Sequence, residues 1–168
     1  MSSPVYSTLR KEMPDNACSE HLKVSKVKVE ERGKQAVFLN PEKEPFVRTQ
    51  VDGCLVKQAT ACDWWISRKG EDSVLVELKG CDVSKALDQI IATFEYLKNS
   101  GSLTKRMAAL VVGRNPPCHP LFTSKLQRTK NRLSNEFKAP LHVVSGNFEY
   151  NMDCVLSHKG PFRVAASE

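Results

Sequence analysis

Residues 73–113 contain the pattern that most limits the fold: a strand-length apolar run, an amphipathic helix and a second apolar run. The runs SVLVELK (73–79) and MAALVVG (107–113) are typical of buried strands. Between them, apolar residues recur with the 3.6-residue period of a helix face, at Val83, Ala86, Leu87, Ile90, Ile91, Phe94 and Leu97. Asp82 can cap the start of this helix and Gly101 can close its end. This order predicts two parallel strands joined by a helical crossover.

Further segments of strand and helix length lie on both sides of this unit. Two runs before it, VDGCLVK and ACDWWIS, can form an antiparallel meander with residues 73–79. In chain order, the expected elements are strands at 23–30, 36–39, 51–57, 61–67 and 73–79, a helix at 83–97, a strand at 107–113, a helix at 123–138 and a strand at 141–144. The expected fold class is α/β (α+β), with a mixed β-sheet flanked by helices.

The length of 168 residues suits a single domain. Residues 1–20 are polar and show no period, so we expect a flexible N-terminal arm before one domain at 21–168. The chain contains no apolar run long enough to cross a bilayer and no visible secretory signal. We therefore expect a cytoplasmic protein that does not associate with a membrane.

The six cysteines form no Cys-x-x-Cys pair. Their even number is compatible with disulfides, but the expected cytoplasmic location favours reduced thiols. A zinc site would need closely spaced pairs of ligands, and Cys118-His119 comes nearest to such a pair. Two adjacent residues seldom reach one tetrahedral ion together, so we expect structural thiols and no zinc.

Positive charge is concentrated in one part of the chain, which has a net charge of +6. Residues 98–138 contain nine basic side chains and one acidic side chain. In the helix expected at 123–138, Lys125, Arg128 and Arg132 are spaced three and four apart, so they line one face. Such a face is either an ordinary solvated helix surface or a contact surface for nucleic acid, and charge alone favours neither.

Two carboxylates and a lysine form the candidate reaction centre. Glu77 and Lys79 lie two residues apart in an expected strand, so their side chains point to the same face. If the strands at 61–67 and 73–79 pair as a hairpin, Asp63 reaches that face near Glu77. Two neighbouring carboxylates repel each other, and a divalent cation such as Mg²⁺ relieves the repulsion. The Leu78 carbonyl can add a ligand, and Lys79 would lie beside a metal-bound water.

This arrangement resembles the signature of the PD-(D/E)XK nucleases, an Asp followed after a spacer by Glu-x-Lys. Here the residues are Asp63, thirteen intervening residues, and Glu77-Leu78-Lys79. Gln89, on the following helix, matches a Gln that members of the family often carry there. The resemblance covers residues 51–113, and it implies a restriction-endonuclease-like core and a nuclease dependent on Mg²⁺ or Mn²⁺.

The chain departs from the family pattern at two places. Cys62 stands where the motif has Pro, and a predicted hairpin at 27–39 occupies the region where many members have their first core helix. A Glu from that first element often helps to bind metal in the family. Glu30 or Glu31 could serve here, although their spacing favours neither residue.

The sequence therefore predicts a metal-dependent nuclease that hydrolyses phosphodiester bonds of DNA, with RNA left open, in bacterial or phage defence or in DNA processing. Asp63, Glu77, Lys79 and Gln89 are the expected catalytic residues, and Asp63, Glu77 and Leu78 the metal ligands. The expected nucleic-acid contacts are Lys85, Arg114, Lys125, Arg128 and Arg132.

Two alternatives stay open beside this hypothesis. The charged triplet can be a simple ion pair at a sheet edge, in a non-catalytic module that binds nucleic acid or protein. The chain can also be an accessory protein that acts on a protein partner. A homodimer or a larger assembly is compatible with each of these possibilities.

Overall fold

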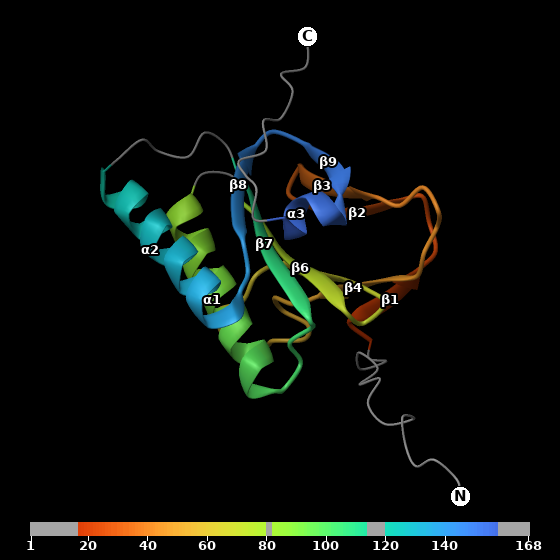
Figure 1. Cartoon of the computed structure of the whole chain (residues 1–168), viewed down its shortest axis with the longest axis horizontal. Coiled ribbons are helices and arrows are strands. Elements are labelled where there is room, and N and C mark those ends of the chain that lie inside the picture. The colour runs from red at the N-terminus through yellow and green to blue at the C-terminus, as the bar shows by residue number, and fades with distance from the viewer. Residues whose placement is uncertain (1–16, 80–81, 114–119, 158–168) are drawn as a thin grey trace, which may run out of the picture.

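The computed structural model describes residues 17–79, 82–113 and 120–157, and it forms a mixed α/β fold with two mixed sheets flanked by three helices (Figure 1). Arg114 and residues 1–16 of the expected arm lie outside the described residues. Ser19 and Glu20 belong to a strand, so the arm predicted at 1–20 is wrong at its C-terminal end. None of the described helices is long and apolar enough to cross a membrane.

The larger sheet has six strands in the order β1-β4-β5-β6-β7-β8. Their bounds are β1 Ser19–Leu22, β4 Phe46–Gln50, β5 Trp64–Arg68, β6 Asp72–Leu78, β7 Arg106–Gly113 and β8 Leu141–Ser145. Strands β1, β4, β5 and β6 pair antiparallel, whereas β6, β7 and β8 pair parallel. Helix α1 (Val83–Asn99) connects β6 to β7, which confirms the predicted crossover. Asp82 caps this helix by accepting a hydrogen bond from the Lys85 N–H.

The smaller sheet consists of β2 (Lys26–Glu31), β3 (Lys34–Leu39) and β9 (Phe148–Asn151). Strands β2 and β3 form the predicted antiparallel hairpin, and β9 joins β3 in parallel. Neither β9 nor the short helix α3 (Met152–Leu156) that follows it was predicted from the sequence.

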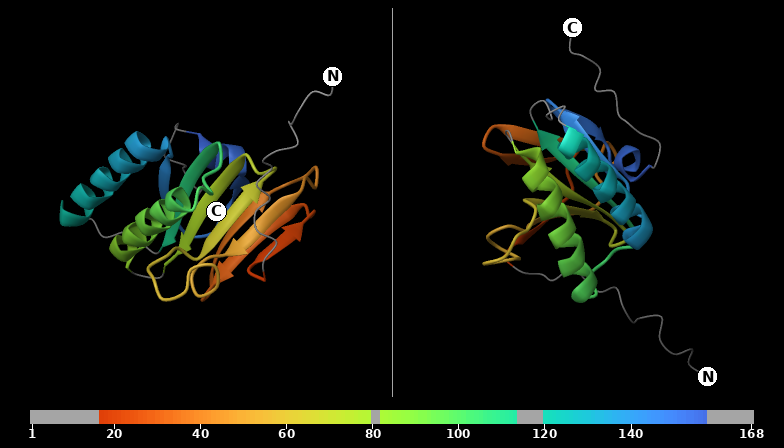
Figure 2. Two further views of the ribbon diagram at one scale, coloured as in Figure 1. Left: turned by 90° about the horizontal axis from the view of Figure 1, so that it is seen from below. Right: turned by 90° about the vertical axis from the view of Figure 1, so that its left-hand side faces the viewer.

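Each face of the larger sheet is covered by different elements (Figure 2). Helices α1 and α2 (Pro120–Phe137) lie on one face, and the smaller sheet and α3 lie on the other. The alternation of side chains along β6 produces this arrangement, because Leu75 packs into the cluster with α1 while Val74 and Val76 pack with the smaller sheet. Glu77 shares its side of β6 with Leu75, so its carboxyl group enters the apolar layer beneath α1.

The strand predicted at 51–57 is wrong. The strand that pairs with β5 is β4, and residues 51–56 instead form a turn in which the Cys54 and Val56 N–H groups both donate to the Val51 carbonyl. Gly53 has a φ of +75°, which suits glycine and ends any extended run. The residues after the turn nevertheless return beside it, since the Val51 N–H donates to the Asp63 carbonyl at 2.9 Å.

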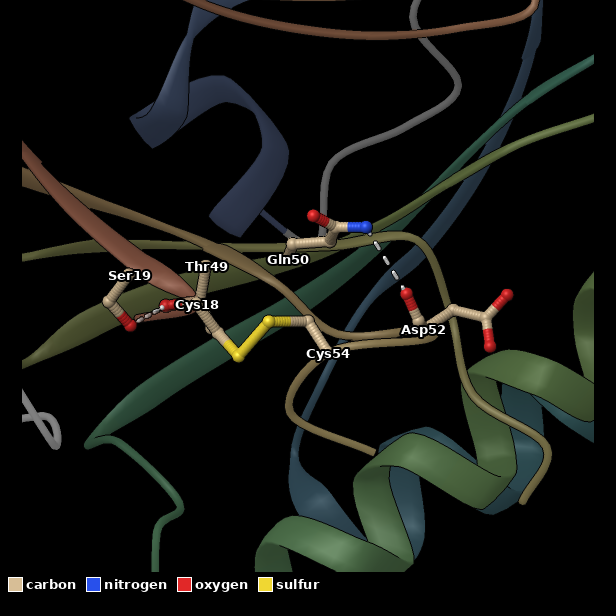
Figure 3. Close-up of a disulfide and its surroundings, with 6 residues drawn as sticks. All are labelled: Cys18, Ser19, Thr49, Gln50, Asp52 and Cys54. Carbon is tan, nitrogen blue, oxygen red and sulfur yellow. Dashed lines mark hydrogen bonds between the residues drawn. A yellow bond between two sulfur atoms is a disulfide. The ribbon is translucent and has the colours of Figure 1, made fainter. Parts of the chain in front are cut away.

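Cys18 and Cys54 form a disulfide, so the prediction that all cysteines are reduced is wrong (Figure 3). Their Cα atoms are 5.7 Å apart, and the bond ties the residue before β1 to the 51–56 turn. Among the described residues, Cys62 and Cys154 are free. Figure 3 shows the Asp52 side chain on the opposite side of the turn from the disulfide, towards α1. The bond therefore holds the turn that carries Asp52.

Candidate active site

The three residues of the predicted reaction centre meet where β5 begins and β6 ends. Asp63 directly precedes β5, Glu77 is the second-last residue of β6, and Lys79 directly follows it. Because the two strands are antiparallel and Trp64 pairs with Val76, the start of one lies beside the end of the other. The Lys79 Nζ atom is 3.3 Å from Glu77 Oε1, so these two side chains share one side of the sheet as predicted.

Asp63 and Glu77 are locked together by two hydrogen bonds that cross between their strands. The Asp63 N–H donates to Glu77 Oε2 at 3.0 Å, and the Leu78 N–H donates to Asp63 Oδ2 at 2.9 Å. Each carboxylate thus uses one oxygen to hold the neighbouring backbone. The second oxygen of each, Oδ1 or Oε1, is left for another partner.

Burial and mutual repulsion make this pair electrostatically costly. Glu77 is fully buried, and burial together with the nearby Asp63 charge raises the pKa of Glu77 to about 8, against the opposing effect of Lys79. Burial also raises the pKa of Asp63, against the opposing effect of the Leu78 N–H, and the charges of Glu31 and Asp52 raise it further. A proton or a cation is therefore favoured at this position.

The carboxylate pair fits the ligand chemistry of a hard divalent cation. Glu77 Oε1 is buried and accepts no hydrogen bond in the described part of the chain, although Lys79 lies close to it. Mg²⁺ binds oxygen ligands and keeps several waters, so two carboxylates can suffice. Within residues 17–79, 82–113 and 120–157, no group of three or more His, Cys, Asp and Glu side chains is clustered as a metal site. The fit thus depends on Asp63 and Glu77.

Helix α1 holds the segment that leads into Asp63. The Gln89 side chain donates from Nε2 to the Ala61 carbonyl at 3.1 Å, and Thr93 Oγ1 accepts from the Cys62 N–H at 2.8 Å. Thr93 also donates to the Gln89 carbonyl at 2.8 Å, which fixes the orientation of its hydroxyl. Gln89 therefore acts on the backbone before Asp63, and Thr93 is a supporting residue that the sequence analysis missed. A threonine within a predicted helix did not by itself indicate this role in the sequence.

Two further acids lie near the pair. Of the two family-based candidates, Glu31 is close enough to influence the Asp63 pKa, whereas Glu30 pairs with Lys28 at 2.8 Å on an exposed face. Asp52 influences the same pKa from the 51–56 turn. Asp52 was not predicted as a site residue, because the apolar residues at 51–57 indicated a strand.

The basic residues expected to bind nucleic acid fall into two groups. Lys125 Nζ contacts the Ser84 carbonyl, the Ser84 hydroxyl and Asp88, each at 2.8–2.9 Å, and Arg132 pairs with Glu95 and Glu136. Lys85 and Arg128 are exposed and make no ion pair with a described residue. Carboxylates thus neutralise two of the three basic residues aligned on α2.

Two hollows adjoin these basic residues. One, of about 360 Å³, includes part of the segment that leads into Asp63 and is lined by Asp52, Gln58, Ala59, Thr60, Ala61, Lys85 and Gln89. The other, of about 380 Å³, is a groove between α1 and α2 lined by Asp88, Ile91, Ala92, Glu95, Lys125, Arg128, Thr129 and Arg132. The first hollow has an unpaired cation on its rim and a buried amide in its wall.

No family model, no curated protein and no solved structure matches this chain.

Proposed function

We propose that the chain is a metal-dependent nuclease of the PD-(D/E)XK type, with a restriction-endonuclease-like core that hydrolyses phosphodiester bonds of DNA. The observation that carries this proposal is the junction of β5 and β6, where Asp63, Glu77 and Lys79 meet. A buried carboxylate beside a second carboxylate and a lysine is costly for stability alone. The same arrangement is useful where a cation and a phosphate must be held together.

Asp63 and Glu77 would hold Mg²⁺ or Mn²⁺ through the oxygens that they do not use for the backbone, and the Leu78 carbonyl could add a ligand. When bound, the ion activates water and offsets negative charge on the phosphate. Burial and the Asp63 charge raise the pKa of Glu77 to about 8, which favours a proton on this carboxyl group at neutral pH, and a bound cation would take the place of that proton. Lys79 is positioned by Glu77 to stabilise charge that develops on the phosphate oxygens.

The proposed surface for the DNA backbone combines Lys85 near the start of α1 with Arg128 on α2. Both cations are exposed and free of carboxylate partners in the described chain. Lys125 and Arg132 would have to exchange their carboxylate partners for phosphates, so they contribute less. Such contacts provide affinity without reading the sequence.

The proposed location is the cytoplasm, although the Cys18–Cys54 disulfide is unusual in a reducing compartment. Counting the free thiols of protein taken rapidly from cells tests this point. Blocking of Cys18 and Cys54 by an alkylating reagent before any reductant is added would mean that the bond is open in the cell.

The decisive experiment is a plasmid-nicking assay with purified protein. Nicking is expected with Mg²⁺ or Mn²⁺ and is expected to stop with EDTA or in the Lys79→Ala variant. The variant Lys105→Ala is a matched control, because Lys105 is an exposed lysine beyond the far end of α1. Equal nicking by wild type and Lys79→Ala would remove the proposed mechanism.

A second candidate is a non-catalytic module that binds nucleic acid or protein. The observation in its favour is that the Asp63 and Leu78 N–H groups and Lys79 already give each carboxylate a partner. This candidate predicts metal-independent binding of DNA and no cleavage under any metal condition.

A further inference from the structure

The Cys18–Cys54 disulfide joins two residues that are both partly exposed at the surface (Figure 3). A disulfide at the surface can be attacked by a thiolate from solution. Cys62, by contrast, is fully buried, and this burial raises the pKa of its thiol, which makes it unreactive. The bond between Cys18 and Cys54 can therefore undergo thiol–disulfide exchange.

The turn that carries Cys54 is bound directly to the segment that enters the reaction centre. The Val51 N–H donates to the Asp63 carbonyl at 2.9 Å, and the Asp52 N–H donates to the Cys62 carbonyl at 3.0 Å. The Cys54 N–H donates in turn to the Val51 carbonyl at 3.2 Å. The disulfide thus holds a turn whose backbone holds Asp63.

This turn has buried ends and an exposed tip. Val51 and Val56 are buried in the core, whereas Asp52 and Gly53 between them are exposed. The buried ends keep the turn attached to the core when the disulfide opens. The tip, which carries Cys54, loses its covalent link to the residue before β1. Reduction is therefore expected to loosen the turn without unfolding the domain.

We propose that the Cys18–Cys54 pair is a redox switch for the reaction centre, which is held firmly in the disulfide state and loosened by a dithiol reductant. A thiolate of the reductant attacks one sulfur of the bond, and the second thiol of the reductant resolves the mixed disulfide. The two cysteines gain two electrons and two protons, and the reductant becomes a disulfide. The same dithiol–disulfide couple reverses the exchange. In a reducing compartment, disulfides are usually transient and serve catalysis or redox sensing, which fits this role.

The switch acts on cation binding through the position of Asp63. In the disulfide state, the turn holds the Asp63 carbonyl while the Leu78 N–H holds its carboxylate. A looser turn gives the Asp63 backbone more freedom. Contacts that orient metal ligands are typically worth about ten- to a hundredfold in metal affinity. Reduction should therefore weaken Mn²⁺ binding about tenfold, an effect that rests on the proposed function.

The first arm of the test records amide NMR spectra of the full chain before and after addition of dithiothreitol, without metal. The amides of Val51, Asp52 and Asp63 are expected to shift, whereas those of β7 should not. Cys154→Ser, which removes a free thiol, should respond like wild type. The double variant Cys18→Ser/Cys54→Ser should resemble the reduced protein and ignore the reductant. A bond that stays closed, unshifted amides at these three residues, or unfolding of reduced wild type overturns the proposal.

The second arm measures Mn²⁺ affinity by electron paramagnetic resonance, after removal of the reductant under nitrogen. Affinity is expected to fall about tenfold on reduction and to return when oxidised glutathione restores the bond. Cys154→Ser should follow wild type, and the double variant should bind weakly throughout. Equally tight binding in both states overturns the switch and leaves the proposed function in place. Failure of Mn²⁺ to bind in either state removes the proposed function, while the redox-dependent position of Asp63 stands or falls on the NMR spectra alone.

Discussion

The backbone N–H of Asp63 donates a hydrogen bond to the side chain of Glu77, so one acid of the pair positions the other. The return bond, from the Leu78 N–H to Asp63, closes the connection. Side-chain positions that are fixed by neighbouring backbone change little when a single surface charge is removed. Substitutions near this junction can therefore separate effects on charge from effects on geometry.

The first prediction concerns pH and stability. The pKa of Glu77 is raised from 4.5 to about 8 in the folded state. Between these two pH values, the folded protein therefore keeps a proton on Glu77 that the unfolded chain has already lost. Without metal, the free energy of unfolding should fall as pH rises from about 4.5 to about 8. Urea titrations at pH 5, 7 and 9 measure this, and Glu77→Gln should flatten the dependence. A wild-type protein that becomes more stable across that range would contradict the pKa shift.

The second prediction separates Lys79 from the carboxylates. Lys79→Ala should slow plasmid cleavage by about a hundredfold or more, because a positioned cation beside the phosphate is lost. Affinity for DNA in Ca²⁺ should barely change. Asp63→Ala should lose activity through weaker metal binding, so excess Mn²⁺ should restore part of it. Equal rescue of both variants by Mn²⁺ would mean that Lys79 acts through the metal.

The third prediction concerns salt. Arg128→Ala should flatten the slope of log K against log salt concentration by about 0.9, the value for one phosphate contact. Lys125→Ala and Arg132→Ala should change the slope less, because both cations already pair with carboxylates of α1. Fluorescence anisotropy with labelled DNA at several salt concentrations measures the slopes. A larger effect of Lys125→Ala than of Arg128→Ala would show that these ion pairs open on binding.

The fourth prediction concerns the disulfide, whose cysteines are 36 residues apart in the sequence. Loop closure over that length is worth about 4 kcal/mol in the chain-entropy account, so Cys18→Ser should destabilise the protein by up to about this amount. Cys154→Ser, which removes a free thiol, is the matched control. Denaturant titrations with and without a dithiol reductant provide the comparison. Wild type in reductant should behave like Cys18→Ser, and an unchanged midpoint would mean that the bond does not form.

The fifth prediction concerns Thr93. Thr93→Val keeps the shape of the side chain but leaves the buried Cys62 N–H without an acceptor, which costs about 1–3 kcal/mol. Thr93→Ser retains the acceptor and should lose less. Thr93→Val should also need more Mg²⁺ for half-maximal cleavage than Thr93→Ser does, because the segment before Asp63 loosens. Identical metal requirements would limit Thr93 to a purely structural role.

The parts of the fold that the sequence predicted are those with strong, local periodicity. Helix α1 and its flanking strands β6 and β7 have long apolar patterns, and they form where predicted. The strand expected at 51–57 failed because its apolar residues support a turn, in which Val51 and Val56 are buried. Strand β9 and helix α3 have four and five residues, too few for a period to be recognised.

In the candidate site too, local spacing predicted contacts correctly, whereas contacts between distant residues were missed. The two-residue spacing of Glu77 and Lys79 predicted that they share one side of a strand, and they do. The contacts of Gln89 and Thr93 with residues 61 and 62 join positions about 30 apart in the sequence, so no local sequence pattern indicates them. The disulfide likewise joins distant residues, and cysteine spacing alone gave no pairing. The nuclease resemblance stays a prediction.

The parallel pairing of β3 with β9 has a consequence for how the chain folds as it is synthesised. Residues 34–39 cannot complete their pairing until residues 148–151 have left the ribosome, more than a hundred residues later. Until then, the β2–β3 hairpin has one unpaired edge, and an isolated hairpin is only marginally stable. Such long-range pairing slows folding. Strand β9 therefore completes the smaller sheet, and until it is added the unpaired edge of β3 can pair with another chain.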